Sequence, residues 1–473
     1  MGDLDDLSAK QFGASFKGFL DKMAAQAPDE EPPFLARLRA HFGSDPATLP
    51  IVAEAFDKKE QANLHIAVDA YANGEGRRSE LLGVAVQHDF FGVKLAQLLA
   101  PGGSPLMGGG APSIGPVQYK NLPVGQDKVL ACVQSGLYLV TDGAVPVALM
   151  VSGSREMDFR GTLSIEVMTA ERATAEAVLA GIRSTMRKRN IYRGHVISLR
   201  RESHQVEVDF HRLPEIGRDD IILPEGLLGR VERLTIKFSE HREKLAAAKR
   251  HLKRGLLLYG PPGTGKTLTA MYLAGRMSDR TTILLTGGGL GLLEESCALA
   301  RALQPATLIL EDVDLVAEER TAQQKACNVV LFELLNQMDG LADDADLLFL
   351  LTTNRPEMLE TALASRPGRI DQAIEVPLPD STCRDRLLSL YSAGLTVELG
   401  DRGKIVERTK GASAAFIREL LRKAALFAAD DAGAGGIVVR DRHFEDALYE
   451  LVALGGDMTK SLLGFAPTGS ATR

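Results

Sequence analysis

The chain is 473 residues long, which exceeds what one ordinary hydrophobic core covers and predicts two or three folding units. Hydrophobic residues make up 45% and charged residues 25%, so the composition is typical of a globular protein and excludes a largely disordered one. The net charge of -7 argues against a dominant, nonspecific nucleic-acid role, because binding to a phosphate backbone requires a basic surface.

A local basic cluster runs from Arg183 to Arg193 and contains Arg187, Lys188 and Arg189. The cluster falls at the end of a predicted helix, where cations interact favourably with the helix dipole. We therefore interpret it as a solvated C-terminal turn in preference to a nucleic-acid patch.

The cysteines and the longest apolar run indicate a cytoplasmic protein. The cysteines are far apart, which fits reduced thiols better than a disulfide framework or a metal site; they are Cys132, Cys297, Cys327 and Cys383. The N-terminus is acidic and lacks the apolar core of a signal peptide. The most apolar stretch, Val129 to Val151, is interrupted by polar residues, glycines and a proline, so we expect paired strands there and no membrane segment.

Residues 1–115 are predicted to form a helical N-terminal region and a linker. Apolar side chains recur at helical spacing, as in Phe12, Phe16 and Phe19. From Pro101 to Gly115 proline, glycine and serine become frequent, which is typical of a linker or a flexible loop.

Residues 116–212 change to short β-rich runs and predict a small α+β module. Runs at 129–133 and 137–140 are predicted strands, and Ala170 to Lys188 is a predicted helix. The last two predicted strands, near Gly194 to Phe210, are assigned to the same module. No motif in this segment indicates a ligand.

From Asp219 onward, predicted strands and helices alternate. Strand-like apolar runs occur at 255–259, 282–286, 307–310 and 347–351. This alternation predicts an α/β fold over 219–379, with a parallel sheet covered by helices on both faces and ligands at the carboxyl ends of its strands. We expect a small helical lid over 380–455 and a tail over 456–473.

A glycine-rich segment follows the first of these apolar runs and opens a helix. It matches the GxxxxGK[ST] pattern with the residues Gly260, Pro261, Pro262, Gly263, Thr264, Gly265, Lys266 and Thr267. The glycines let backbone N–H groups turn toward phosphates, the helix N-terminus adds its positive end, and Lys266 reaches the outer phosphates. Since the Thr267 hydroxyl ligates magnesium in this arrangement, the motif predicts that ATP and Mg²⁺ bind here.

Two adjacent acids, Glu311 and Asp312, end a later apolar run. After a phosphate loop, the first acid is expected to hold magnesium, directly or through its water shell, and the second to orient or deprotonate the attacking water. The usual order, Asp before Glu, is reversed here, but each position still carries a carboxylate, so we interpret the site as active. Asn354 ends the next apolar run and is the candidate sensor of the γ-phosphate or the attacking water.

Three further segments complete a resemblance to a known family: Asn336 to Gly340, Thr353 to Pro356 and Ser365 to Asp371. Together with the two nucleotide motifs they resemble the AAA ATPases, over roughly half of the chain. In that family the two arginines of the last segment reach the γ-phosphate of the neighbouring subunit. The resemblance therefore implies that Arg366 and Arg369 act in trans within a homo-oligomeric ring, usually a hexamer.

The order Glu-Asp looks most like the mitochondrial AAA translocase that moves the folded Rieske protein. Two segments depart from the family pattern. Gly287 to Leu293 lacks the aromatic residue with which threading members grip a polypeptide, and Gly411 to Phe416 has Ala and Phe where the family's adenosine-contacting segment has Gly and Asp. No HExxH arrangement is present, so a zinc protease is not expected.

The leading functional hypothesis is an ATP-hydrolysing ring that remodels or translocates a protein client, with residues Met1 to His211 supplying recognition. Its first rival is a nucleotide-dependent assembly scaffold or switch with little hydrolysis, which the short acid Asp312 and the missing pore aromatic favour. The second rival is a nucleic-acid translocase, which the acidic charge balance disfavours.

Overall fold

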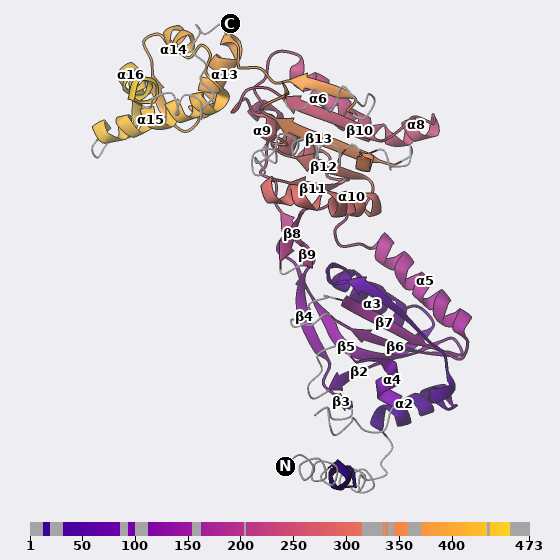
Figure 1. The fold of residues 1–473 in the computed structure, drawn as a ribbon. Coiled ribbons are helices and arrows are strands. Elements are labelled where there is room, and N and C mark those ends of the chain that lie inside the picture. Colours follow the sequence, from indigo (N-terminus) through magenta and orange to yellow (C-terminus); the bar gives the residue numbers. More distant parts are fainter. Residues whose placement is uncertain are drawn as a thin grey trace, which may run out of the picture. The chain divides into compact units, whose positions relative to one another are not determined.

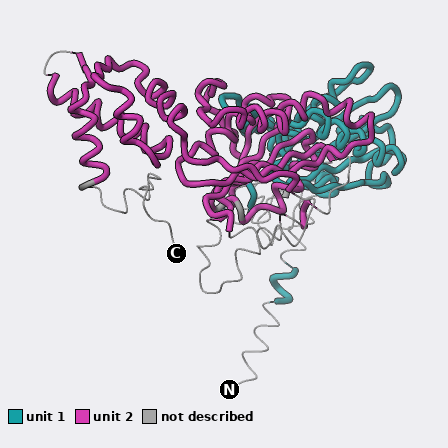
Figure 2. Tube along the Cα trace, turned by 90° about the horizontal axis from the view of Figure 1, so that it is seen from above, with its two compact units in different colours: residues 1–191, 202–206 teal, residues 192–201, 207–473 magenta. Residues whose placement is uncertain are grey.

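The chain folds into two compact units, seen in Figure 2; the first comprises Met1–Ile191 and Glu202–Val206, and the second Tyr192–Arg201 and Glu207–Arg473. A computed structural model describes residues 13–18, 32–85, 93–99, 112–153, 162–202, 205–314, 334, 336–338, 345–357, 370–432 and 436–454. No helix among these residues is long and apolar enough to cross a membrane.

The first unit is built on a seven-stranded sheet in the order β1-β7-β6-β5-β2-β3, with β4 paired to β5 (Figure 1). The strands are β1 (Ile51–Asp57), β2 (Arg77–Ala85), β3 (Ser113–Gly115), β4 (Gln118–Pro123), β5 (Val129–Asp142), β6 (Val145–Ser152) and β7 (Thr162–Met168). All of the neighbouring pairs run antiparallel. The predicted strands at 129–133 and 137–140 form one continuous strand, β5.

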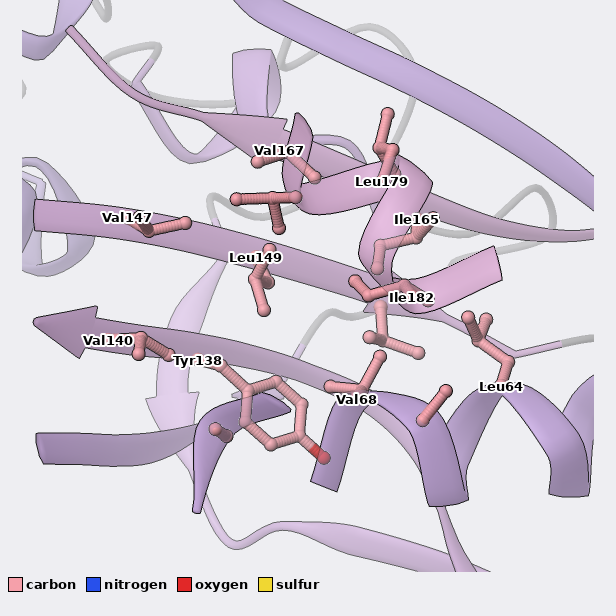
Figure 3. Close-up of a cluster of buried hydrophobic side chains, with 14 of the residues drawn as sticks. Leu64, Val68, Tyr138, Val140, Val147, Leu149, Ile165, Val167, Leu179 and Ile182 are labelled. Carbon is pink, nitrogen blue, oxygen red and sulfur yellow. The ribbon is translucent and has the colours of Figure 1, made fainter. Parts of the chain in front are cut away.

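Helices cover both faces of this sheet, because each strand alternates its side chains between two cores. In β5, Tyr138 and Val140 pack into a core with helices α3 (Gln61–Ala72) and α5 (Arg172–Lys188), part of which Figure 3 shows. Leu137 and Leu139 point to the opposite face and pack with α2 (Pro33–Phe42) and α4 (Leu95–Leu99). The first unit is therefore a three-layer α+β domain.

The prediction of a helical region over 1–115 is wrong for residues 51–57 and 77–85, which are strands. β1 pairs with β7, so that Ile51 lies opposite Met168, and β2 pairs with β5. Both partners lie far along the chain, and non-local pairing of this kind overrides the helical spacing seen in the flanking segments. The predicted boundary near residue 115 consequently falls inside the sheet.

The second unit is built on another seven-stranded sheet, in the order β14-β10-β13-β12-β11-β8-β9. Its strands are β8 (Val196–Glu202), β9 (Gln205–His211), β10 (Arg254–Tyr259), β11 (Thr281–Leu285), β12 (Ala306–Leu310), β13 (Leu347–Thr353) and β14 (Gln372–Glu375). Every pair from β14 to β8 is parallel. The assignment of 196–211 to the α+β module is wrong, because β8 pairs with β11 of this second sheet and β9 is its edge strand.

One set of helices packs around this sheet, and a second set forms a separate lid. The helices of the nucleotide core are α6 (Leu227–Leu234), α7 (Ile236–Glu240), α8 (Arg242–Ala247), α9 (Lys266–Arg276) and α10 (Leu293–Ala302). The lid contains α13 (Ser381–Tyr391), α14 (Arg402–Arg408), α15 (Ala414–Ala432), α16 (Asp441–Tyr449) and the small sheet of β15 (Thr396–Glu398) and β16 (Val438–Arg440). The lid has its own hydrophobic core, centred on Phe416, Leu420 and Phe444. The alternation of strands and helices also predicts a long helix that ends at Met338, and this segment lies mostly outside the described residues.

A buried arginine, Arg280, joins the starts of β12 and β13. Its side chain donates to Asp346 Oδ1 at 2.6 Å, to the Ala306 carbonyl at 2.7 Å and to Thr307 Oγ1 at 3.1 Å, and the residue is only 3% exposed. Removing one partner of a buried ion pair leaves the other charge uncompensated. We therefore expect Arg280→Ala to lower the free energy of unfolding by about 3–5 kcal/mol.

The measurement is urea unfolding followed by far-ultraviolet circular dichroism, in parallel with Arg276→Ala. Arg276 is exposed at the end of α9, so Arg276→Ala removes the same kind of side chain from the surface. We expect the Arg276→Ala midpoint to stay close to that of the wild type. Equal midpoints for the two variants would contradict the role given to Arg280.

Candidate nucleotide site

The predicted phosphate loop lies between the end of β10 and the start of α9. Its backbone depends on glycine at three positions, where φ is 143° (Gly260), 72° (Gly263) and 97° (Gly265). At Gly260 a Cβ atom would also lie 2.3 Å from the Val376 carbonyl oxygen. The loop therefore curves tightly enough for its N–H groups to converge on a phosphate at the N-terminus of α9.

Lys266 folds back over this loop. Its ammonium group donates to the carbonyl oxygens of Gly260 and Pro261, both at 2.8 Å, and the residue is 5% exposed. Burial lowers the pKa of Lys266 to about 8, although the charges of Asp312 and Asp314 oppose this shift. The lysine is thus held beside the loop, in a place where a phosphate group would favour its charged form.

Glu311 and Thr267, the side chains predicted to hold magnesium, share a hydrogen bond. Burial raises the pKa of Glu311 and the charge of Asp312 adds to the rise, while a hydrogen bond with the Thr267 side chain opposes it. Glu311 Oε1 is buried and has no hydrogen-bond partner among the described residues. A buried carboxylate oxygen without a donor fits a cation ligand, and magnesium typically takes one or two protein oxygens together with substrate phosphates and water.

Asp312 adopts a left-handed backbone conformation, with φ 48°. Residues other than glycine adopt this conformation infrequently, aspartate among the more frequent of them, and such conformations cluster at functional sites. The Asp312 N–H donates to Thr352 Oγ1 at 3.0 Å, and Asn354 Nδ2 donates to Asp312 Oδ1 at 3.1 Å. Burial raises the pKa of Asp312, the charge of Asp314 raises it further, and Lys266 and Asn354 lower it. The result is a carboxylate whose proton affinity is increased, which suits a general base.

Asp314 is a functional candidate to which the sequence pattern assigned no role. It is 4% exposed, and its Oδ1 atom accepts from Thr353 Oγ1 at 2.8 Å and from the Asn354 N–H at 3.2 Å. The buried carboxylate therefore fixes the backbone of the residue that contacts Asp312. The signal in the sequence that could have identified Asp314 was its place as a third acid, two positions after the predicted pair.

The strand order explains how separate motifs come together. β13 lies between β10 and β12, so the residues that follow these three parallel strands emerge at one edge of the sheet. The phosphate loop, the acids and Asn354 all follow the carboxyl ends of these strands. Arg366 and Arg369 lie outside the described residues, and their positions stay predictions.

A cavity of about 820 Å³ adjoins the loop and extends to the lid. Asp312 and Asn354 line it with Lys266, and its apolar wall includes Met271, Leu387 and Tyr391. This volume is in the range of small-molecule sites, and the mixture of an apolar wall and a phosphate-binding end suits a nucleotide.

The altered lid segment packs directly on the phosphate loop. The Ala415 N–H donates to the Gly263 carbonyl at 3.1 Å, and a Cβ at Gly263 would lie 2.8 Å from Ala415 Cβ and from Ser413 Oγ. Small side chains at these positions therefore permit close backbone contact. Arg418, which the sequence did not single out, lines the cavity one helical turn after Ala414 on α15.

The segment at the position of the family's pore loop follows β11. Residues Gly287–Leu292 form a short 3₁₀ helix between β11 and α10. The segment contains only glycine and leucine, so it offers no aromatic ring to a partner.

The glycine-rich loop, the adjacent acids and Asn354 follow neighbouring parallel strands, which is the arrangement of a P-loop fold. Residues 256–378 match the family described as "ATPase family associated with various cellular activities (AAA)". The chain therefore contains an AAA ATPase domain, as its motifs predicted.

Named relatives also match part of the chain. The chain is 35% identical over 191 residues to the proteasome-activating nucleotidase of Thermococcus onnurineus (strain NA1), which covers 38% of this chain and 48% of that protein. It is 34% identical over 189 residues to the 26S proteasome regulatory subunit 10B homolog A of Arabidopsis thaliana, which covers 37% of this chain and 47% of that protein. The chain thus spans about half the length of these relatives. The narrower resemblance to the Rieske-protein translocase stays a prediction.

The pKa of Lys266 predicts how nucleotide affinity depends on pH. Because this pKa is about 8 in the free protein, Lys266 is mostly charged at pH 7 and mostly neutral at pH 9. Only the charged form attracts phosphate, so we expect the Kd for a fluorescent ADP derivative, measured in EDTA, to rise about tenfold from pH 7 to pH 9. Lys266→Met should bind weakly at both values and show little change between them. A wild-type Kd that does not depend on pH would contradict this assignment.

Proposed function

We propose that this protein binds Mg²⁺-ATP at the site described above, hydrolyses it, and works as a ring of identical subunits that remodels or translocates a protein client. The observation that supports hydrolysis best is the contact of 3.1 Å between Asn354 Nδ2 and Asp312 Oδ1, beside the phosphate loop. It joins the candidate base to the candidate sensor at the edge of the sheet where the γ-phosphate is expected.

Each residue of the site has a separate task in this proposal. Lys266 exchanges its bonds with the loop carbonyls for contacts with the outer phosphates. Asp312 accepts a proton from the attacking water, and Asn354 orients that water or the Asp312 carboxylate. Asp314 holds Asn354 in place. When bound, magnesium neutralises charge on the phosphate oxygens, and Thr267 and Glu311 are the side chains that hold it.

The reversed acid pair is compatible with this proposal. Aspartate is one methylene shorter than glutamate, so its carboxylate reaches less far from the strand. The left-handed backbone at Asp312 redirects this shorter side chain, and the Asn354 amide holds its carboxylate. Local strain of about 1–3 kcal/mol is a cost that folds retain at positions with a function.

The ring rests on the resemblance of Ser365 to Asp371 to the corresponding AAA segment. Arg366 and Arg369 are proposed to reach the γ-phosphate bound by the neighbouring subunit, where an arginine stabilises the charge that develops on the transferred phosphoryl group. Hydrolysis then depends on assembly. An isolated subunit contains the base and the sensor but no arginine at its own γ-phosphate.

The protein client is proposed from the relatives and from the first unit. The names of both relatives connect them with the proteasome. The first unit of this chain is a folded domain outside the matched segment, and we propose that it recognises the client. Since Gly287–Leu292 has no aromatic side chain, remodelling does not depend on a ring stacked against a threaded polypeptide in this proposal.

Phosphate release measured against protein concentration tests this function. If the site is completed in trans, turnover per subunit rises as subunits assemble and then reaches a plateau. Lys266→Met serves as the background control, because it removes the phosphate-binding cation. Turnover that is equal at all concentrations would contradict the arginines in trans.

The alternative is a nucleotide-dependent scaffold or switch, which the shorter base favours. Under that alternative the wild type binds the fluorescent ADP derivative, assembles with nucleotide, and releases no more phosphate than Lys266→Met at any concentration. The same titration therefore separates the two functions.

A further inference from the structure

The first unit contains a cavity of about 590 Å³ that the nucleotide site does not use. Its walls come from α3, from α5, from the start of β2 and from the end of β5, through Ala70, Tyr71, Arg77 and Asp142 among others. The part of α5 that faces it is one stripe with helical spacing from Thr174 to Lys188, and the C-cap residue Arg189 continues it.

One end of this cavity is rigid and electrically balanced. Arg77 forms an ion pair of 2.9 Å with Asp142, donates to the Tyr71 carbonyl at 3.1 Å, and places its guanidinium 4.1 Å from the centre of the Tyr71 ring. The Tyr71 hydroxyl in turn donates to Asp142 at 3.4 Å. The charge of Arg77 is thus largely compensated, and its side chain is held in one position.

The other wall carries positive charge that is not compensated. Lys188 and Arg189 line the cavity at the end of α5 and are exposed, and neither forms an ion pair with any described residue. Between the two ends, α5 offers Ala177, Val178 and Gly181, and a Cβ at Gly181 would meet nothing within 4 Å. A favourable helix dipole accounts for cations at this helix end, but it does not account for the open, small-residue floor beside them.

We propose that this cavity binds a carboxylate carried by a short apolar peptide segment, either a free C-terminus or an acidic side chain. Lys188 and Arg189 attract the carboxylate, and the small and apolar side chains of α5 accept the adjoining residues. The Arg77–Asp142 ion pair leaves the opposite wall without net positive charge, so that wall offers no attraction to a continuous polyanion. This inference rests on the proposed client-remodelling function and gives the client a chemical signature.

Fluorescence anisotropy with the full-length protein tests the proposal. Three probes carry an N-terminal tetramethylrhodamine on the peptide Gly-Ser-Ala-Leu-Val-Ala: the free acid, the amide, and an amide with glutamate in place of valine. We expect the free acid, the glutamate amide or both to bind, with an affinity that falls as salt rises, and the neutral amide to bind at least about tenfold more weakly. Which acidic probe binds identifies the source of the carboxylate. Equal binding of all three probes, or no binding of either acid, overturns the proposal.

Variants connect the binding to the cavity. We expect Lys188→Glu/Arg189→Glu to weaken binding about tenfold or more, since it replaces attraction by repulsion. Gly181→Met, which fills the floor and suits a helix, should weaken it as well. The matched control is Arg78→Glu/Lys128→Glu, which makes the same charge change at exposed positions of the first unit outside the cavity. An equal loss in the control, or no loss in the cavity variants, overturns the assignment.

Two further readouts distinguish the cavity proposal from the proposed ATPase function. Phosphate release without peptide should be unchanged in the cavity variants, because none of these residues belongs to the nucleotide site. Failed peptide binding with normal phosphate release contradicts only the cavity proposal, whereas peptide binding without phosphate release contradicts only the ATPase. Displacement of the acidic probe by oligo(dT) at comparable concentration would overturn the peptide assignment in favour of a nucleic acid.

Discussion

Replacement of Asp312 by asparagine is expected to lower phosphate release by about 10²- to 10⁴-fold while nucleotide binding is retained. Asparagine preserves the size of the side chain and its bond with Asn354 but removes the group that accepts a proton. Since Lys266 and the phosphate loop are untouched, the Kd for the fluorescent ADP derivative should change little. Single-turnover hydrolysis of radiolabelled ATP, together with this Kd, is the measurement.

Two controls sharpen the result for Asp312. Asp312→Glu restores a base one methylene longer, and we expect it to keep far more activity than Asp312→Asn. Glu311→Gln should instead impair magnesium-dependent binding, because it changes the proposed metal ligand. Phosphate release from Asp312→Asn within about twofold of the wild type would rule out Asp312 as the base.

Subunits that carry Arg369→Ala are expected to regain activity when they are mixed with Asp312→Asn subunits. Each variant alone should lose at least about 10²-fold in turnover, because one variant lacks the arginine and the other lacks the base. In a mixed ring, an intact Asp312 on one subunit can meet an intact Arg369 on its neighbour. Random assembly of equal amounts restores about a quarter of the wild-type interfaces.

The control for this mixing experiment is Lys266→Met in place of Arg369→Ala. A mixture of Lys266→Met and Asp312→Asn subunits contains no site with both a functional loop and a base, so it should stay inactive. Activity of the Arg369→Ala mixture that equals the sum of its two parts would mean that the arginine does not act across subunits. Repeating the mixture with Arg366→Ala tests the other arginine in the same way.

The nucleotide core was largely predictable because its signals are local. Buried parallel strands appear in the sequence as continuous apolar runs. The runs predicted at 255–259, 307–310 and 347–351 correspond to β10, β12 and β13 with small shifts at their ends. The residues expected to bind phosphate and magnesium follow these runs directly, so their chain positions were enough to place them together.

The first unit was less predictable because its sheet is built from distant pairings. The segment Ile51–Asp57 alternates between exposed and partly buried positions, but its partner β7 begins at Thr162. The sequence of β8 and β9 likewise reads as a pair of short strands and does not say which sheet they join. Only the tertiary contact with β11 decides this, and local propensity contains no information about it.

Part of the site depends on tertiary contacts in the same way. Asp314 lies two positions after the acid pair in the sequence, but its proposed role depends on its buried contacts with Thr353 and Asn354. Arg418 becomes a candidate only because the lid packs on the phosphate loop at Gly263. Such residues belong to no contiguous motif, since the packing of separate elements brings them to the nucleotide.

In the proposed function, ATP is bound and cleaved at the carboxyl ends of β10, β12 and β13, in a site completed by a second subunit. The most direct test is a cryo-electron microscopy map of the full-length protein with Mg²⁺-ADP and beryllium fluoride. We expect a ring with nucleotide density against residues 260–267, a metal beside Thr267 and Glu311, and Arg366 or Arg369 of the adjacent subunit at the fluoride. A ring whose nucleotide meets no arginine from its neighbour, or a map with the loop empty at saturating nucleotide, would contradict the proposed function.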